Sequence, residues 1–562
     1  MFRVTRRLCQ RRHPNPLSAS LASRYQTTSS YHNTGNTDDK QYSEPKNYSA
    51  SPRFIFFGAA TVLGYAYYRT FGIRKLSADA QFKDLAPPER KDLPIYKRDE
   101  VKKHGKGSQR IWVTFQNGVY DVTDFVESHP GGDKILLAAG DAVDSYWQMY
   151  AQHKKSEVLE ILEEMRIGTL DPNDMKIETR KVDVDDPYAN EPVRHPALVV
   201  ANHKPFNAET PPTLLVDHFC TPNELFFVRN HLPVPDVDVS KHHLQVEGLG
   251  VKRPLNLSVD ELKNSFAPVH ITSAIQCSGN RRANMNAYKK VQGLMWKETA
   301  ISNAKWTGVR LRDLLIHAGV DPSDKQIKHV HLEGADKDPT GGQNYGASIP
   351  FEKAMSPETI VAYRMNDEDI PRDHGAPLRL IVPGVVGARQ VKWLKTVRLS
   401  DVESPSHWQQ KDYRVFSASV NAGDELKWET VPSIQEYPIQ SAFCIPQPGA
   451  TVSRSEETID VAGYAWSGGG RGIIRVEIST DGGKTWQTAD IEQHPQQDQE
   501  HMWSWTLFRA SVKIPEGVDK MELVVKATDR SYNTQPETSA GIWNIRGLLN
   551  NAWHKVEVKI KD

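Results

Sequence analysis

Cys277 is the side chain with the clearest capacity for chemistry in this chain. It stands in the motif QCSGNRR at 276–282, where a glycine and two arginines follow the thiol. The thiolate form of cysteine binds metal ions, and nearby positive charge favours that form. The motif FVRNH at 227–231 adds a second cationic segment. The two motifs point to a soft metal ligand beside an anion pocket; the alternative for a lone cysteine is a small buried apolar residue.

Further basic side chains of the middle segment lie among glycine, proline and asparagine residues. Arginine binds tetrahedral oxyanions through a planar, permanently charged fork. In the run GVVGARQVKW at 384–393, the glycines would also let backbone N–H groups approach a phosphate. Any one of these residues taken singly could instead be a solvated surface group. The set comprises Arg229, Arg281, Arg282, His374, Arg379, Arg389 and Lys392.

Two upstream histidines are candidates for a second metal site. His129 begins HPGG at 129–132, and His153 follows later in the same segment. Proline fixes the backbone, and the glycines permit close approach of a flat ligand. Two neutral imidazoles on opposite sides of an apolar slot would ligate a haem. The alternatives are a surface turn for His129 and a helix C-terminal cation for His153.

The elements around these histidines predict a small folded unit at 86–170. A strand is expected at 110–115, a hairpin turn at Asn117-Gly118 and a return strand at 119–122. One helix is expected to begin within 94–101, and two more are expected at 144–153 and 155–166. A polar, acidic and proline-marked linker at 171–187 predicts a flexible tether.

The segment 188–425 is predicted to mix helices and strands, with a strand at 378–382 and a helix at 311–318. It contains no GxGxxG, Walker, HExxH or GxSxG motif, so a nicotinamide or flavin domain is not indicated. The segment 426–562 is all-β in pattern and predicts an immunoglobulin-like sandwich. Its single SxDxGxxW motif at 479–486 resembles a sialidase Asp box, and a structural hairpin turn is the favoured interpretation.

Length and composition agree with this division. At 562 residues the chain should hold about three or four domains. Hydrophobic residues make up 38% and charged residues 25%, which is typical of a soluble globular protein. The four cysteines are scattered without a CxxC pair, which argues against a disulfide framework and a zinc ribbon.

The N-terminus predicts a targeting segment at 1–78. Its first 37 residues hold six arginines and no acidic residue, as in a mitochondrial presequence. A basic tail that contacts nucleic acid is the alternative, but no aromatic-interleaved basic patch supports it. The 15 uncharged residues at 54–68 fall short of the ~20 that span a bilayer. A sorting signal removed near 76–81 is favoured over a permanent anchor, and the expected compartment is the mitochondrial intermembrane space.

The first folded unit resembles the cytochrome b5 family. The resemblance rests on VYDVTDFVESHPGG at 119–132, AGDA at 139–142 and His153. It implies that His129 and His153 are the axial ligands of a b-type haem.

The rest of the chain resembles the molybdenum cofactor and dimerisation domains of the sulfite oxidase family. The matching motifs are FVRNH, CSGNRR, Trp296, PRDHG at 371–375, GVVGARQVKW, SHWQQKDY at 406–413 and IWNIRG at 542–547. The fold class expected from both resemblances is α+β and multidomain. A cytochrome b5-like haem domain comes first, then a mixed α/β molybdopterin domain, then the β-sandwich. The mitochondrial members of the family have this domain order.

The resemblance also implies a site. Cys277 would be the protein sulfur ligand of molybdenum, with the other sulfurs from molybdopterin. The sulfite pocket would be lined by Arg229, Arg282, Trp296, Tyr413 and Arg546. The cofactor would be held by Phe227, Val228, Arg229, Asn230, His231, Asp336, His374, Arg379, Gln390, Val391 and Lys392. Ser278 departs from the alanine expected beside the metal ligand.

The implied activity is oxidation of sulfite to sulfate, with electrons passing through the haem to cytochrome c. Residues 79–562 have 58 basic and 67 acidic side chains, a formal charge of −9 that suits a basic acceptor. A homodimer is expected, and no nucleic acid partner. Nitrate reductase is a rival, but it places its haem unit after the molybdenum domain. A haem electron carrier without enzymatic activity is the second rival, and the arginines around Cys277 argue against it.

Overall fold

The computed structural model describes the first folded unit in part and residues 186–562 continuously. The described residues are 87, 90–126, 128–129, 135–136, 138–144, 147, 153, 156–174 and 186–562. The predicted presequence, the apolar segment 54–68, most of the tether and most of the helix expected at 144–153 lie outside them. In this described part, no helix is long and apolar enough to cross a membrane.

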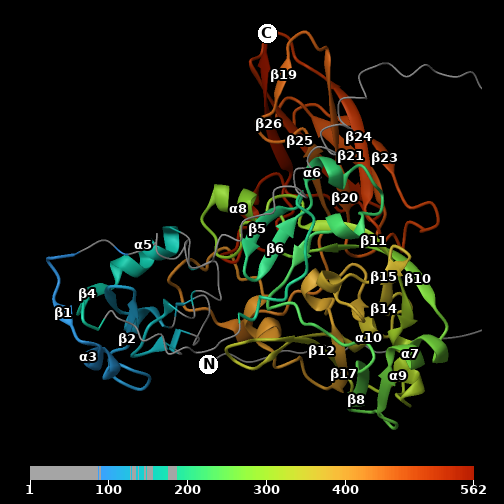
Figure 1. Ribbon diagram of the computed structural model, residues 1–562. Helices are drawn as coiled ribbons and strands as arrows, with labels where there is room; N and C mark the ends of the chain where they lie inside the picture. The colour runs from blue at the N-terminus through green and yellow to red at the C-terminus, as the bar shows by residue number, and fades with distance from the viewer. Residues whose placement is uncertain are drawn as a thin grey trace, which may run out of the picture. The chain divides into compact units, whose positions relative to one another are not determined.

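The segment 90–174 contains a four-stranded sheet in the order β1-β4-β3-β2 (Figure 1). Val113 and Phe115 of β2 are fully buried and pack with Leu162 of α5 in one apolar cluster. The elements are β1 (Ile95–Tyr96), α3 (Arg98–Lys102), β2 (Trp112–Phe115), β3 (Gly118–Asp121), η2 (Thr123–Phe125), α5 (Ser156–Glu164) and β4 (Arg166–Leu170).

The hairpin between β2 and β3 turns one residue earlier than predicted. Phe115 pairs with Gly118, so the two-residue loop is Gln116-Asn117 and not Asn117-Gly118. Gln116 takes the positive φ of 49°. Gly118 is needed for packing, because a Cβ there would lie 2.1 Å from the hydroxyl oxygen of Tyr120.

Three sheets build the middle of the chain, and their strand orders are β5-β6-β7, β10-β11-β14-β15 with β16 on β14, and β13-β12-β17-β8-β9. β11 is buried along almost its whole length because it lies between β10 and β14. The strands are β5 (Val199–His203), β6 (Phe206–Glu209), β7 (Val228–Arg229), β8 (His243–Gly248), β9 (Leu255–Ser258), β10 (Val269–Gln276), β11 (Ile301–Arg310), β12 (His329–Lys337), β13 (Asn344–Pro350), β14 (Ile360–Met365), β15 (Glu368–Asp369), β16 (Arg379–Ile381) and β17 (Leu394–Ser400).

Short helices connect these strands. The capping box of α7, formed by Ser258 and Glu261, fixes the start of one of them. The α-helices are α6 (Pro212–Leu215), α7 (Val259–Ser265), α8 (Arg282–Tyr288), α9 (Leu311–His317) and α10 (Phe351–Ala354). The other helical turns are η5 (Asn223–Leu225), η6 (Arg372–His374), η7 (Gly387–Arg389), η8 (Trp408–Asp412) and η9 (Trp428–Thr430).

Two sheets of the C-terminal segment face a shared apolar cluster, which confirms the predicted β-sandwich (Figure 1). Their orders are β18-β20-β24-β23 and β19-β26-β25-β21-β22. The carboxylate of Asp481 accepts hydrogen bonds from the N–H groups of Lys484 and Thr485, so the SxDxGxxW motif closes a turn. The elements are β18 (Gln440–Ile445), β19 (Thr451–Ser453), β20 (Thr458–Trp466), β21 (Ile473–Ser479), β22 (Gln487–Thr488), β23 (Asp490–Glu492), β24 (Thr506–Lys513), β25 (Lys520–Asp529), η10 (Ser539–Gly541) and β26 (His554–Lys561).

Candidate functional site

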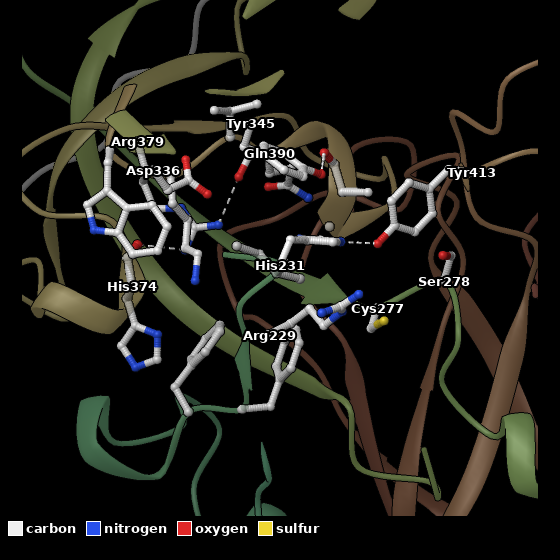
Figure 2. A pocket seen from close by; sticks show the side chains of 18 residues that line it. Arg229, His231, Cys277, Ser278, Asp336, Tyr345, His374, Arg379, Gln390 and Tyr413 are labelled. Carbon is white, nitrogen blue, oxygen red and sulfur yellow. Dashed lines mark hydrogen bonds between the residues drawn. The ribbon is translucent and has the colours of Figure 1, made fainter. Parts of the chain in front are cut away.

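Cys277 lies directly after β10, where the chain leaves the sheet and turns into α8. The N–H of Asn280 donates to the carbonyl of Cys277 (2.9 Å), which closes a tight turn behind the thiol. The Cys277 side chain lines a pocket, although the residue is only 6% exposed. Figure 2 shows its sulfur beside the side chain of Arg229. The thiol therefore lies next to a cation at a pocket wall, and not in a wholly apolar core.

This pocket gathers most of the predicted site residues from separate segments of the chain. The space that atoms leave unfilled here is about 650 Å³, counting the part open to solvent. The predicted residues that line it are Phe227, Arg229, His231, Cys277, Asp336, His374, Arg379, Gln390, Val391, Lys392 and Tyr413.

Arg229 supplies the positive charge beside the thiol. Its Nη1 donates to the carbonyl of Asn230 (2.7 Å) and to the amide oxygen of Asn207 (3.1 Å), which orient the guanidinium. Burial works against the charge, but neighbouring Tyr413 and Cys277 raise the pKa of Arg229 above its ordinary value. Arg229 is therefore a fixed cation at this end of the pocket.

His231 and Tyr413 form a hydrogen-bonded pair across the same end, between the ring Nε2 and the hydroxyl (Figure 2). Burial, followed by the charges of Arg229 and Lys392, lowers the pKa of His231 well below its ordinary value. Burial raises the pKa of Tyr413. Both groups are neutral near pH 7, and Tyr413 keeps its hydroxyl proton.

The opposite end of the pocket holds His374, Arg379 and Asp336 (Figure 2), with Lys392 in the same lining. Arg379 donates to the carbonyls of His374 (2.9 Å) and Gln390 (3.2 Å). Burial lowers the pKa of Arg379 to about 9 and that of His374 to about 4. It also lowers the pKa of Lys392. Burial thus opposes the positive charge gathered here, and an anion would favour it.

Two buried polar atoms at the far end of the lining test whether a polar cofactor fits. Arg379 Nε and Asp336 Oδ1 find no hydrogen-bond partner among the described residues. Buried polar groups are normally satisfied, so such atoms call for a bound group. A cofactor with a phosphate near Arg379 and polar ring atoms near Asp336 would supply these partners. The residues present therefore fit a phosphate-bearing pterin.

Asp373 supports Lys392 from behind the lining, and sequence reasoning assigned it no role. Its carboxylate accepts from Arg194 Nε (2.8 Å) and Nη2 (2.9 Å) and from Asn230 Nδ2 (3.1 Å). Its backbone carbonyl accepts from Lys392 Nζ (2.8 Å), and the amide oxygen of Asn230 accepts from the same ammonium. Arg194 stands far from any motif in the sequence, so no local signal could have revealed it.

Five predicted residues are not part of the lining: Val228, Asn230, Arg282 and Trp296 are buried, and Arg546 is half-buried. Trp296 is fully buried in the apolar cluster that also contains Cys277. Arg282 donates to the carbonyls of Arg546 (3.1 Å) and Leu294 (2.7 Å). Arg546 in turn pairs with Asp412. Burial lowers the pKa of Arg282, while neighbouring Cys277 raises it, so Arg282 lies within electrostatic reach of the thiol.

Two arginines expected to bind anions instead bind protein oxygens, so that interpretation was wrong for them. Arg281 donates to the carbonyls of Ser441 (3.2 Å) and Ala552 (2.6 Å). Arg389 donates to the carbonyls of Ile434 and Trp408. A guanidinium satisfies several carbonyls with the same fork that would hold an oxyanion, so the two uses look alike in sequence.

Tyr345, Phe226 and Trp393 also line the pocket, although the sequence did not single them out. The Tyr345 hydroxyl donates to the carbonyl of Ala388 (2.7 Å), and its ring centroid lies 4.7 Å from that of His231. Tyr345 comes from β13, whose pattern is that of an ordinary strand. Only the folded sheet reveals which of its side chains faces the pocket.

The described residues of the first unit bring His129 and His153 together. Their ring centroids are 6.3 Å apart, with 14° between the ring planes. Two metal–imidazole bonds of about 2 Å each would account for about 4 Å of this separation, and the ring radii for the remainder. The ring centroid of Trp147 lies 5.0 Å from that of His153, and the ring of Phe125 meets His129 edge-on. Two facing imidazoles with aromatic neighbours fit a haem.

Three family models match the chain in the predicted order. The cytochrome b5-like haem/steroid binding domain matches residues 97–171, the oxidoreductase molybdopterin binding domain 231–408, and the Mo-co oxidoreductase dimerisation domain 431–561. The sulfite oxidase of Gallus gallus is 49% identical over 465 residues, covering 82% of this chain and 99% of that protein. The chain belongs to the sulfite oxidase family.

Two further similarities agree with this membership. The mitochondrial sulfite oxidase of Homo sapiens is 49% identical over 474 residues, covering 83% of this chain and 84% of that protein. The crystal structure of the sulfane dehydrogenase SoxCD from Paracoccus pantotrophus superposes with a TM-score of 0.53 at 26% identity, over 66% of this chain and 87% of that one. The predicted fold class and the haem and molybdopterin cofactors of a sulfite oxidase family member are thereby confirmed.

Proposed function

We propose that this chain oxidises sulfite to sulfate and passes the two electrons singly through its haem to cytochrome c. Each turnover adds one oxygen atom from water to sulfite and releases two protons and two electrons. The observation that carries the proposal is the Cys277 thiol beside half-buried Arg229, at the wall of the pocket that gathers the predicted cofactor residues, in a member of the sulfite oxidase family.

The residues at the two ends of the pocket would hold different parts of the cofactor. Molybdenum held by the molybdopterin dithiolene supplies oxygen-atom transfer and two-electron redox chemistry when it is bound. Cys277 would be its protein sulfur ligand. His374, Arg379 and Lys392 would hold the phosphate at the opposite end. The rest of the cradle would comprise Phe227, Val228, Arg229, Asn230, His231, Asp336, Gln390 and Val391.

The thiol end of the pocket supports an anionic substrate. Sulfite would lie against the Arg229 guanidinium, whose charge favours entry of the anion and stabilises charge in the transition state. Tyr413 keeps its proton, because burial raises its pKa, and can donate a hydrogen bond to a sulfite oxygen. Arg282, Trp296 and Arg546 would complete the substrate site from immediately behind the lining.

The first unit would accept the electrons. His129 and His153 would be the axial ligands of one haem b, and both are presented as imidazoles facing each other. A tether at 171–187 would let the haem unit of 86–170 approach the molybdenum domain of 188–425 and then leave it. Deleting several tether residues should slow electron transfer between the two centres; an unchanged rate would oppose this role.

The remaining assignments concern location and assembly. The arginine-rich segment 1–78, with its apolar stretch at 54–68, supports import into mitochondria and delivery to the intermembrane space. The mitochondrial naming of the human relative agrees with this. The match of 431–561 to a dimerisation domain supports a homodimer built through the sandwich at 426–562.

The purified full-length protein provides the test. We expect molybdenum and iron in equal amounts, and cytochrome c reduction that requires sulfite. Iron without molybdenum, together with haem reduction by other donors alone, would favour the rival electron carrier. Nitrate-dependent turnover without sulfite oxidation would instead favour the nitrate reductase alternative.

A further inference from the structure

The loop that holds Cys277 is hydrogen-bonded along its length to the C-terminal sandwich domain. The hydroxyl of Tyr437 donates to the backbone carbonyl of Cys277 itself (2.7 Å). Three residues farther on, the side-chain amide of Asn280 donates to the hydroxyl of Tyr464 (2.8 Å). Between these contacts, the N–H of Leu549 donates to the carbonyl of Ser278 (2.8 Å). The sandwich thus bonds to the thiol loop at Cys277, Ser278 and Asn280.

Arg281 extends this attachment at the end of the loop. Its φ of 61° is in the left-handed region, which is uncommon for a residue with a side chain. Its guanidinium donates to the carbonyls of Ser441, Ala552 and Trp553, all in the sandwich. The side-chain bonds therefore hold the backbone in a conformation that a free loop would rarely adopt.

Apolar packing joins the two domains independently of these hydrogen bonds. One large apolar cluster includes Leu380 and Val385 of the middle domain together with Trp466 and Trp505 of the sandwich, so burial already joins the two parts. Tyr437 and Tyr464 add hydrogen bonds of defined geometry to these apolar contacts. The ring of each tyrosine is buried, and its hydroxyl bonds to the thiol loop.

We propose that the sandwich domain positions the thiol of Cys277, with Tyr437 and Tyr464 as the positioning residues. The proposal rests on the proposed role of Cys277 as the molybdenum ligand. The peptide plane after Cys277 sets the direction of its Cα–Cβ bond, and the Tyr437 hydroxyl fixes that plane from outside the pocket. A metal site needs its ligands held to within about 0.5 Å, which a loop without such supports does not provide.

The test uses the full-length holoenzyme with single-oxygen deletions, Tyr437→Phe and Tyr464→Phe. The matched control is Thr534→Val, which removes a hydroxyl that donates to the carbonyl of Ala527 (3.2 Å) within the sandwich and away from the loop. Each protein is compared with its parent for molybdenum content, thermal unfolding, sulfite kcat and KM, and the paramagnetic resonance spectrum of the molybdenum.

We expect Tyr437→Phe to lower kcat between about tenfold and about a hundredfold, as for a displacement of about 1 Å in an active site. Its sulfite KM should stay within twofold, because Arg229 is untouched, and its molybdenum spectrum should change. Tyr464→Phe should show the same pattern more weakly, and Thr534→Val should match the parent in every measurement.

Parent kcat and parent spectra in both tyrosine variants would overturn the proposal. Loss of folded protein in both would also overturn it, since the hydroxyls would then serve the fold as a whole. A parent protein that lacks molybdenum or sulfite turnover would instead refute the proposed function, so the two failures are distinguishable.

Discussion

The proposed molybdenum pocket and the proposed haem site would hold a redox centre by opposite means. The haem site presents two imidazoles from a single short stretch of chain, with Trp147 and Phe125 as aromatic neighbours. The other pocket presents cations, such as half-buried Arg229 and buried Arg379, from segments far apart in sequence. One site depends on the placement of neutral rings, and the other depends on charges brought together by the fold.

This difference determines what each site needs from its surroundings. A buried cation is costly unless it is hydrogen-bonded and paired. Arg229, Arg379 and Lys392 each donate to backbone carbonyls, and Asp373 with Arg194 adds a buried ion pair behind Lys392. The pocket is therefore supported by a layer of polar residues, whereas His129 and His153 each have an aromatic ring beside them.

The largest expected effect is that of Cys277→Ser. Replacing the sulfur by oxygen removes the soft ligand, so we expect sulfite oxidation to fall on the order of a thousandfold or more, as for a residue the chemistry requires. The haem absorption spectrum should be unchanged, because that site is built separately. The control is Cys220→Ser, whose thiol lies outside the pocket lining and should be dispensable. Normal turnover by the Cys277 variant would remove this residue from the metal site.

The reciprocal variant, His153→Ala, removes a candidate ligand from the proposed haem site. Loss of one axial imidazole should abolish bound haem or shift its spectrum, and cytochrome c reduction should fall to background. Sulfite oxidation measured with a small artificial oxidant should remain within a few-fold of the parent, since the pocket is intact. If both activities disappeared together, the two sites would not be independent.

The third comparison is between Arg229, which lines the pocket, and Arg282, which does not. Arg229→Gln removes a lining cation, and a charge-assisted contact of about 1.5–3 kcal/mol corresponds to a sulfite KM roughly 10 to 150 times higher. Sequence reasoning predicts a KM increase of orders of magnitude for Arg282→Gln as well. Its guanidinium is occupied by two carbonyls, so we expect a smaller KM change and a larger loss of stability. Steady-state kinetics and thermal unfolding of both variants decide the order.

More of the proposed haem site than of the proposed molybdenum pocket could be predicted from sequence. Its two candidate ligands, His129 and His153, come from one segment, so a local motif is enough to suggest them. Cys277 and Arg229 could be predicted as pocket residues in the same way, because each stands in a dense motif. Tyr345, Arg194 and Asp373 act through long-range contacts, and only the folded sheets place them.

Errors of the sequence reasoning have a common physical cause. Arg281 and Arg389 are of the residue type that binds anions, but their guanidinium groups donate to backbone carbonyls. Gly118 is of the residue type that forms turns, but the fold requires it because a side chain there would contact Tyr120. In each case one residue type serves two physical purposes, and the surrounding structure selects between them.

A smaller effect is expected for Arg194→Met, which tests the polar support behind the pocket. The change leaves the Asp373 carboxylate buried without its bidentate partner and should lower the free energy of unfolding by about 3 kcal/mol. The exposed Arg454→Met, which breaks pairs with Asp519 and Asp562, is the control and should cost about 1 kcal/mol or less.

The loss of unfolding free energy in Arg194→Met should depend on pH in a defined direction. Burial raises the pKa of Asp373, but Arg194 outweighs it and holds that pKa below the ordinary 3.8. In the parent, this carboxylate therefore stabilises the fold above pH 3.8 and loses that contribution as the pH falls. In the variant, burial alone would raise the pKa. The difference between parent and variant should be largest near pH 7 and shrink below about pH 4 in denaturant titrations; a constant difference would exclude Asp373 as its source.

The smallest effect is expected for Ser278→Ala, next to the metal ligand. The Ser278 hydroxyl is buried and has no hydrogen-bond partner within the part of the chain that the structure describes. Burying such a group costs free energy, so its removal should leave stability equal or raise it by up to about 1 kcal/mol. Sulfite kcat and KM should stay within twofold of the parent, because Arg229 and Tyr413 supply the contacts to the anion. A tenfold loss of activity would instead show that this hydroxyl bonds to the cofactor or the substrate, and that the thiol end of the pocket relies on a neutral donor as well as on its cations.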